Sequence, residues 1–452
     1  MKLNLLKYSV FLGMVILGFS SCEKYLDAKP SASLAVPVTI ADFQSMLDQY
    51  TTLNENDPCS GEISAGDTYL TDADFLNRAE TEQRMYTWRN SNVYVPADNE
   101  WAASYRQAYY ANSVIEGMLK IEVSDRNRAQ WNDVTGQAYF IRAKAHSQVL
   151  GLFALALGDN NGSTEGIVLK LNTNFNEVSS RSNLIDSYMQ VIADLKKAVL
   201  LLPVSSKHVV RPSRPAAFGL LARTYLFMRD YPNAYLYADS CLQLKNTLID
   251  YNTLNPTATY PLAQFNGEVI HASKMRILAA LNNTRAKIVS ELYNSFEEND
   301  LRKTIFFRNN NNGTFAFKGS YDGSAAPFSG IATDEVVLIR SESQCRMGQV
   351  GASMADLNAL LKKRYKTGTF SEYVNVSQAG LLRTILNERK KELLLRGLRW
   401  MDIKRQNIEG AGISLLRSIN GSIYSLPANS KRFAMPIPEE VIQSSNVTQN
   451  LY

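Results

Sequence analysis

The sequence predicts a mostly α-helical protein, built from helical hairpins that are separated by long irregular loop insertions. Helices are expected over 101–121 and 184–202, and over 131–156, which is crowded with small and apolar residues. The segment 54–99 is rich in Asn, Asp, Gly and Ser without a lasting helical period, and the pattern becomes irregular again over 246–330. With 452 residues, of which 45% are hydrophobic and 20% charged, the chain can bury a large core.

The N-terminus carries the features of a secretory signal that ends at a lipidation site. Residues 1–21 have a basic start and an apolar run from Val10 to Phe19, which is shorter than a membrane-spanning helix needs. Small residues then precede Cys22, which resembles a bacterial lipobox. We therefore expect cleavage before Cys22, multiple acylation that anchors the protein stably, and a polar tether over 22–38.

Charge and cysteine usage exclude several classes of function. The formal net charge is +5, and Lys2 and Lys7 lie in the predicted leader, so the remaining bias is too small to suggest nucleic acid as a partner. The other cysteines are widely spaced and odd in number, which predicts buried free thiols rather than a disulfide framework. Neither they nor the three histidines form a metal-binding pattern; these residues are Cys59, Cys241, Cys345, His146, His208 and His271.

The helices follow one another along the chain in a recognisable order. An amphipathic helix begins behind Thr39, a good N-cap, and extends to Tyr50. The helix 101–121 carries Trp101 and Tyr105, which we interpret as core residues. The helix 131–156 is rich in small residues that favour close packing, and Pro203 ends the helix 184–202.

One helical hairpin has the spacing of a tetratricopeptide repeat. Its turn is Asp230-Tyr231-Pro232, and the characteristic positions are occupied by Phe218, Leu221, Ala222, Tyr225, Ala234, Ala238 and Cys241. A weaker copy runs from Glu335 to Arg346 and, after Gly348, over 354–364. The sequence thus predicts an interrupted array of such helices over about 101–245 and 335–405, with binding residues on the insertions.

The two insertions supply the candidate ligand-binding residues. Sugar recognition combines flat aromatic rings, which stack on a pyranose, with groups that bond to its hydroxyls. The first insertion offers this combination in Asp67, Tyr69, Tyr86, Trp88, Arg89, Asn90 and Tyr94, and the second offers Tyr321. For each single ring, packing within the loop remains an alternative.

The most distinctive stretch lies near the end, over Glu388–Arg405. An amphipathic helix is broken at Gly397, and a second turn brings Arg399, Trp400, Asp402 and Arg405 together. Arg399 and Asp402 are three apart and are expected to pair, with Trp400 as a buried anchor. We interpret this stretch as a structural motif and not as a catalytic site.

The same stretch resembles the C-terminal signature of the SusD/RagB family of bacterial outer-membrane nutrient-binding lipoproteins. In that family a Glu-rich helix runs into Gly-x-Arg-Trp-x-Asp-Leu-x-Arg, and the commonest form has Glu where this chain has Arg396. The Pro-Ile-Pro of 436–438 and the terminal Gln-Asn-Leu-Tyr of 449–452 resemble the closing segments of the family.

The resemblance implies both a fold and a function. It implies a single SusD-like domain over 39–452 with an α–α superhelix. It also implies a lipid-anchored protein on the exterior of the outer membrane that binds an oligomeric nutrient, most often a glycan. The protein would deliver this ligand to a SusC-like TonB-dependent transporter, without a cofactor.

Two other functions are alternatives to glycan binding. A glycoside hydrolase would need paired carboxylates, for which Asp67 with Asp72 or Asp74 can be nominated, but carboxylates are common in solvated loops. Because the sequence has no assembled catalytic constellation, we predict that the protein is not an enzyme. A peptide-binding or protein-interaction scaffold with TPR-like helices stays open as the alternative.

Overall fold

The computed structural model describes residues 36–158 and 164–452. The predicted signal peptide 1–21, Cys22 and most of the predicted tether 22–38 lie outside these residues. Within them, no helix is both long and apolar enough to cross a membrane.

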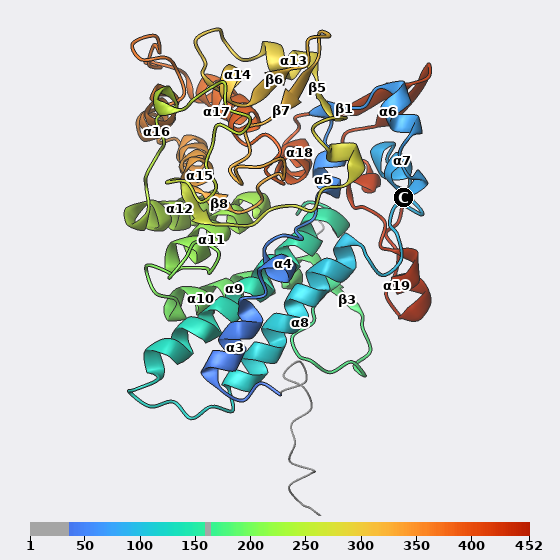
Figure 1. The fold of residues 1–452 in the computed structure, drawn as a ribbon, viewed down its shortest axis with the longest axis vertical. Helices are drawn as coiled ribbons and strands as arrows, with labels where there is room; N and C mark the ends of the chain where they lie inside the picture. The colour runs from blue at the N-terminus through green and yellow to red at the C-terminus, as the bar shows by residue number, and fades with distance from the viewer. Residues whose placement is uncertain (1–35, 159–163) are drawn as a thin grey trace, which may run out of the picture.

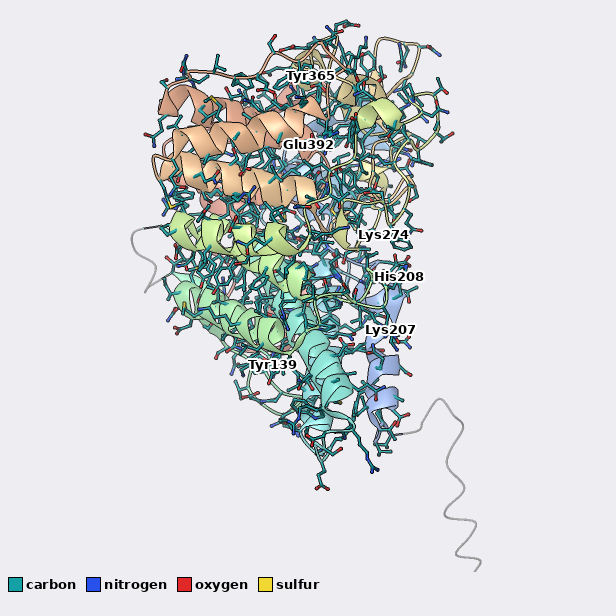
Figure 2. All side chains as sticks on the ribbon, turned by 90° about the vertical axis from the view of Figure 1, so that its left-hand side faces the viewer. Tyr139, Lys207, His208, Lys274, Tyr365 and Glu392 are labelled. Atoms are coloured by element: carbon teal, nitrogen blue, oxygen red, sulfur yellow. The ribbon has the colours of Figure 1, made fainter. Side chains whose placement is uncertain are left out.

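The scaffold is an array of helices in which most neighbours in chain order pack together. Figure 2 shows its green and orange helices stacked in layers. The array confirms the predicted mostly helical fold; it consists of α8 (Glu100–Met118), α9 (Arg128–Phe153), α10 (Leu184–Leu201), α11 (Arg214–Met228), α12 (Tyr231–Leu244), α15 (Thr333–Arg346), α16 (Val350–Lys362), α17 (Gln378–Glu392) and α18 (Arg399–Ile408).

The hairpin of α11 and α12 shows how the sequence determines the repeat. Arg229 has a left-handed backbone conformation at the end of α11 (φ 62°), and the side chain of Asp230 accepts a hydrogen bond from the Asn233 amide to cap α12. Ala222, Ala234, Ala238 and Cys241 are buried where the helices meet. Their small side chains allow the close approach that the repeat spacing predicts.

The first insertion contains more regular structure than predicted. The expected helix 39–50 is present as α3 (Ile40–Leu47), capped by Thr39, and the chain continues with α4 (Tyr50–Leu53), α5 (Ser60–Ser64), β1 (Thr68–Tyr69), α6 (Asp72–Leu76) and α7 (Glu80–Tyr86). Loops still make up most of 54–99, but the short helices and the strand within it were not expected. Helices of one or two turns are too short to produce a lasting apolar period, so the sequence pattern did not reveal them.

The second insertion consists of short elements, as expected of an irregular segment. They are η3 (Tyr251–Thr253), β4 (Val269–His271), η4 (Ala279–Leu281), β5 (Lys287–Ile288), α13 (Ser290–Asn294), α14 (Arg302–Ile305), β6 (Phe307–Asn309), β7 (Phe315–Phe317) and β8 (Ile331–Ala332). β6 and β7 form an antiparallel hairpin. β1 of the first insertion pairs antiparallel with β5 of the second, so the two insertions lie side by side (Figure 1).

The remaining strands and helices join distant parts of the chain. β2 (Glu165–Val168) pairs with β3 (Arg181–Asn183), and β9 (Leu415–Ile419) forms a hairpin with β10 (Ser422–Leu426). The chain then passes through η5 (Lys431–Phe433) and α19 (Glu439–Ser444). Among the described residues, a single cluster of buried side chains extends from Phe43 to Val447.

The packing of α3 on α8 is close at Gly117. A Cβ atom at this position would lie 2.0 Å from Cζ of the buried Phe43 ring. We expect Gly117→Ala to lower the free energy of unfolding by about 1–3 kcal/mol, because the clash outweighs the gain in helix propensity of about 1 kcal/mol. The measurement is urea unfolding of both proteins.

Gly351 in α16 provides the matched control for this substitution. A Cβ atom there would meet nothing within 4 Å. Gly351→Ala is therefore expected to raise the free energy of unfolding by up to about 1 kcal/mol. If the two alanine variants were equally stable, the tight packing of α3 on α8 would be contradicted.

Candidate functional site

Four of the predicted ligand-binding rings are buried in the core. Tyr86, Trp88, Tyr94 and Tyr321 are 3%, 4%, 8% and 2% exposed. Their polar atoms have partners inside the protein: the Tyr86 hydroxyl accepts a hydrogen bond from the Leu70 amide at 2.9 Å, and Trp88 Nε1 donates to the Ser64 carbonyl at 3.0 Å. The structure corrects the expected position of these rings, because packing leaves them no face on which a sugar could stack.

Arg417 of β9 explains why two of these rings lie inside. Its guanidinium carbon lies 3.4 Å from the centre of the Tyr86 ring and 4.9 Å from that of Trp88. Arg417 also donates to the Ile63 carbonyl at 2.6 Å. The hairpin of β9 and β10 thus covers the first insertion through contacts between residues that are far apart in sequence.

Tyr321 belongs to a buried polar cluster around Arg396. The Tyr321 hydroxyl donates to Glu268 at 2.8 Å, and the guanidinium carbon of Arg396 lies 4.6 Å from the centres of both the Tyr321 and Phe328 rings. Arg396 also forms an ion pair with Asp334 at 3.0 Å. A cation is therefore stabilised here, at the position where the family signature commonly has Glu.

Asp67 is part of the scaffold as well. It is buried, its carboxylate lies 3.4 Å from Lys390 Nζ, and its second oxygen lies 3.5 Å from Arg399 Nε. The predicted pairing of Arg399 with Asp402 is thus corrected. Asp402 pairs instead with Arg389 of α17 at 2.9 Å and with Arg405 at 2.8 Å.

The turn between α17 and α18 is the physical reason for this exchange of partners. Leu395 and Gly397 both have left-handed backbone conformations, with φ of 56° and 76°. The turn places Asp402 against Arg389 while Arg399 faces Asp67. Burial by itself would raise the pKa of Asp402, but Arg389 and Arg405 hold this pKa below its ordinary value.

Trp400 and Arg405 connect this turn to the rest of the protein. Trp400 is buried, its Nε1 donates to the Phe433 carbonyl at 3.1 Å, and its ring lies 4.8 Å from the Phe433 ring. Arg405 forms two hydrogen bonds to Glu342 of α15, at 2.6 and 2.8 Å. These residues hold helices together and lie away from the surface, which agrees with a structural interpretation of the motif.

The carboxylates nominated for hydrolysis have structural partners. Asp72 accepts a hydrogen bond from the Asn420 amide at 3.0 Å. Asp74 accepts one from the Thr71 hydroxyl at 2.8 Å and lies 3.5 Å from Lys287 Nζ. Over 36–158 and 164–452, no group of three His, Cys, Asp or Glu side chains could hold a metal ion, and Cys59, Cys241 and Cys345 are buried free thiols.

The accessible part of the predicted site is small. Arg89 and Asn90 are exposed, and Tyr69 is half-buried in β1. The guanidinium carbon of Arg89 lies 5.5 Å from the ring centre of Tyr424, a half-buried residue of β10. We call Arg89, Asn90 and Tyr424 the loop face.

The loop face combines charged donors, an amide and an aromatic ring, and can bind hydroxyl-rich or anionic ligands. Sequence reasoning missed Tyr424. β10 reads Ser-Ile-Tyr-Ser-Leu, without a clear alternation of apolar and polar residues, so no local signal placed Tyr424 beside Arg89.

Asp72 and Asp74 are thus engaged in contacts within a helical scaffold with loop insertions. One family model, described as "Starch-binding associating with outer membrane" and named SusD-like, matches residues 24–226. A second, described as "SusD family", matches residues 257–452. The chain belongs to the SusD/RagB family, which is non-catalytic.

Solved structures share the fold across nearly the whole chain. A SusD superfamily protein from Bacteroides thetaiotaomicron is 20% identical with a TM-score of 0.76, and covers 92% of this chain and 100% of its own. A putative sugar binding protein from Bacteroides vulgatus is 18% identical with a TM-score of 0.75, covering 92% and 99%. A SusD-like carbohydrate binding protein from the same species is 18% identical with a TM-score of 0.66, covering 92% and 97%. A search of curated proteins found no match.

Proposed function

We propose that this protein is a lipoprotein on the surface of the outer membrane that binds an oligomeric glycan and delivers it to a SusC-like TonB-dependent transporter. The observation that carries the proposal is the match of both parts of the chain, 24–226 and 257–452, to models of one family. The family description names starch binding and the outer membrane. The solved relatives named as sugar- or carbohydrate-binding support the same ligand class.

The arrangement of the helices supports a role in capture rather than in chemistry. The helical array supports the two insertions, which the pairing of β1 with β5 joins to each other. Arg89 and Asn90 of the loop face are exposed and offer hydrogen-bond donors to sugar hydroxyls. Transport itself would draw on the partner, because this protein would contribute binding alone.

Calorimetric titration tests the ligand class. The probes are neutral oligosaccharides, namely maltoheptaose, cellohexaose, xylohexaose and mannohexaose, with a random peptide library as the competing class. We expect binding of at least one oligosaccharide at millimolar concentration or tighter. Binding of peptides but of no oligosaccharide would replace the proposal with the peptide-binding alternative.

The anchor and the transporter are tested in cells. The parent protein is expected in the outer-membrane fraction and to co-purify with the product of a neighbouring transporter gene. Cys22→Ala removes the only thiol that could carry the lipid in the proposed position, so this variant is expected in the soluble fraction. Equal membrane retention of both proteins would refute the lipid anchor.

A further inference from the structure

A groove whose lining shares no residue with the loop face has the chemistry of a sugar-binding site. Its volume is about 210 Å³, and it lies between α8, the segment that joins β2 to β3, and the region of α19. In Figure 1 this segment lies in the lower half, together with α3, whereas β1 and α6 of the first insertion lie in the upper half.

Two aromatic rings at the edge of the groove are accessible to a ligand. Phe175 is 80% exposed and Tyr109 is 38% exposed, and their ring centres are 5.0 Å apart. Phe175 is the most exposed apolar side chain of this segment, which also exposes Leu171 and Val178. The buried Trp101 and the half-buried Tyr105 also line the groove, with rings 4.8 Å apart.

The segment that carries Phe175 is held in place by a dense set of hydrogen bonds. The Thr173 amide and hydroxyl donate to the two carboxylate oxygens of Glu116 in α8, at 2.7 and 2.6 Å. The Asn112 side chain donates to the carbonyls of Lys170 and Asn172, at 3.0 and 3.1 Å. Phe175 thus projects from an ordered segment, so ligand binding does not carry the entropic cost of ordering this segment.

Polar groups around the groove favour a neutral polyhydroxylated ligand. Asn172, Asn174, Ser179 and Ser445 line it together with the rings and with Val168, Val441 and Val447, and Lys170 is its only charged lining residue. Rings beside uncharged hydrogen-bonding groups match the apolar face and hydroxyl rim of a pyranose.

We propose that this groove is a second glycan-binding site, separate from the loop face, in which a pyranose stacks against Phe175 and Tyr109. The inference rests on the proposed function, because it assigns a further site for the same class of ligand. The groove is smaller than the roughly 300–1,000 Å³ of pockets that enclose drug-sized ligands. It therefore accommodates one end or one unit of an oligosaccharide.

Four proteins test the groove with the neutral oligosaccharide panel. They are the parent, a groove variant (Tyr109→Ala with Phe175→Ala), a loop-face variant (Arg89→Ala with Tyr424→Ala) and the control Val178→Ala. Val178 is 70% exposed in the same segment but does not line the groove. Because Phe175 and Tyr109 are exposed, the groove variant is expected to fold, which circular dichroism and thermal unfolding verify.

We expect the groove variant to lose affinity at least tenfold for an oligosaccharide that the loop-face variant and Val178→Ala still bind. Phe175→Tyr, which keeps a ring, is expected to retain affinity within about threefold of the parent, because stacking survives. If the groove variant bound every oligosaccharide within twofold of the parent, the groove would be excluded while the proposed function stood. If the parent bound no oligosaccharide, both the groove proposal and the proposed glycan-binding function would be refuted.

Discussion

Replacement of Arg405 by alanine is expected to lower the free energy of unfolding by about 3–5 kcal/mol. Arg405 is fully buried and bonds to Glu342 at 2.6 and 2.8 Å and to Asp402 at 2.8 Å. Its removal leaves two buried carboxylates short of a cation, and the low polarity of the interior makes an unpaired charge expensive.

The position of Arg405 adds to this cost. Glu342 lies on α15 and Asp402 on α18, so Arg405 joins two helices of the array. Arg346 and Arg389 keep one bond each to these carboxylates, at 2.9 Å in both pairs. They limit the loss of stability but do not replace the two hydrogen bonds that Arg405 donates to Glu342.

Urea unfolding of the parent, Arg405→Ala and Arg128→Ala measures the effect. Arg128 pairs with Asp125 at 3.5 Å, and the side chains are 57% and 99% exposed. Exposed pairs contribute about 0–1 kcal/mol, so Arg128→Ala is expected to change stability little. A loss below about 1 kcal/mol in Arg405→Ala would contradict the structural role of the signature motif.

The second large effect is a dependence of stability on pH that originates at Glu62. This residue of α5 is buried, and burial, together with the nearby Asp67 charge, raises its pKa from 4.5 to about 7. Its Oε1 accepts a hydrogen bond from the Leu398 amide at 3.0 Å, at the start of α18. The protonated carboxyl is thus favoured in the folded protein.

The direction of the effect follows from the two pKa values. Below pH 4.5 the carboxyl is protonated in both the folded and the unfolded protein, and its stabilising contribution is fully present. As pH rises from 4.5 through 7, the unfolded chain has released the proton that the folded protein still holds, so stability falls. The total loss is about 3 kcal/mol, since one pKa unit corresponds to about 1.4 kcal/mol.

Glu62→Gln removes this titration while it keeps an oxygen for the Leu398 amide. Between about pH 5 and pH 8 we expect the parent to lose about 2–3 kcal/mol more unfolding free energy than Glu62→Gln does. Urea unfolding at the two pH values measures the difference. Glu122→Gln, a change at an exposed carboxylate, is the control and should follow the parent. Parallel curves for the parent and Glu62→Gln would exclude the assignment to Glu62.

The helical scaffold could be predicted because its signals are local. The apolar period of α10, the small residues of α9 and of the α11–α12 hairpin, and the cap at Asp230 all depend on neighbours within a few positions. The short helices α5, α6 and α7 escaped prediction because so few turns carry no lasting period.

The candidate site could be predicted only in part, because accessibility depends on contacts between distant segments. Aromatic and polar residues in a loop suggest sugar recognition equally well whether the rings face solvent or the core. Arg417 covers Tyr86 and Trp88, and Arg89 meets Tyr424, through the fold of the β9–β10 hairpin. The ring pair of Tyr109 and Phe175 likewise joins a helix to a separate segment.

The signature over 388–405 shows which properties the sequence determined and which needed the tertiary structure. The sequence by itself determined the class of fold, the break before α18 and the family, because these depend on residue type and spacing. Only the tertiary structure decided that Arg399 faces Asp67 while Asp402 pairs with Arg389 and Arg405. Partner choice among buried charges follows from how the helices pack, and a pairing rule for one helix does not contain that information.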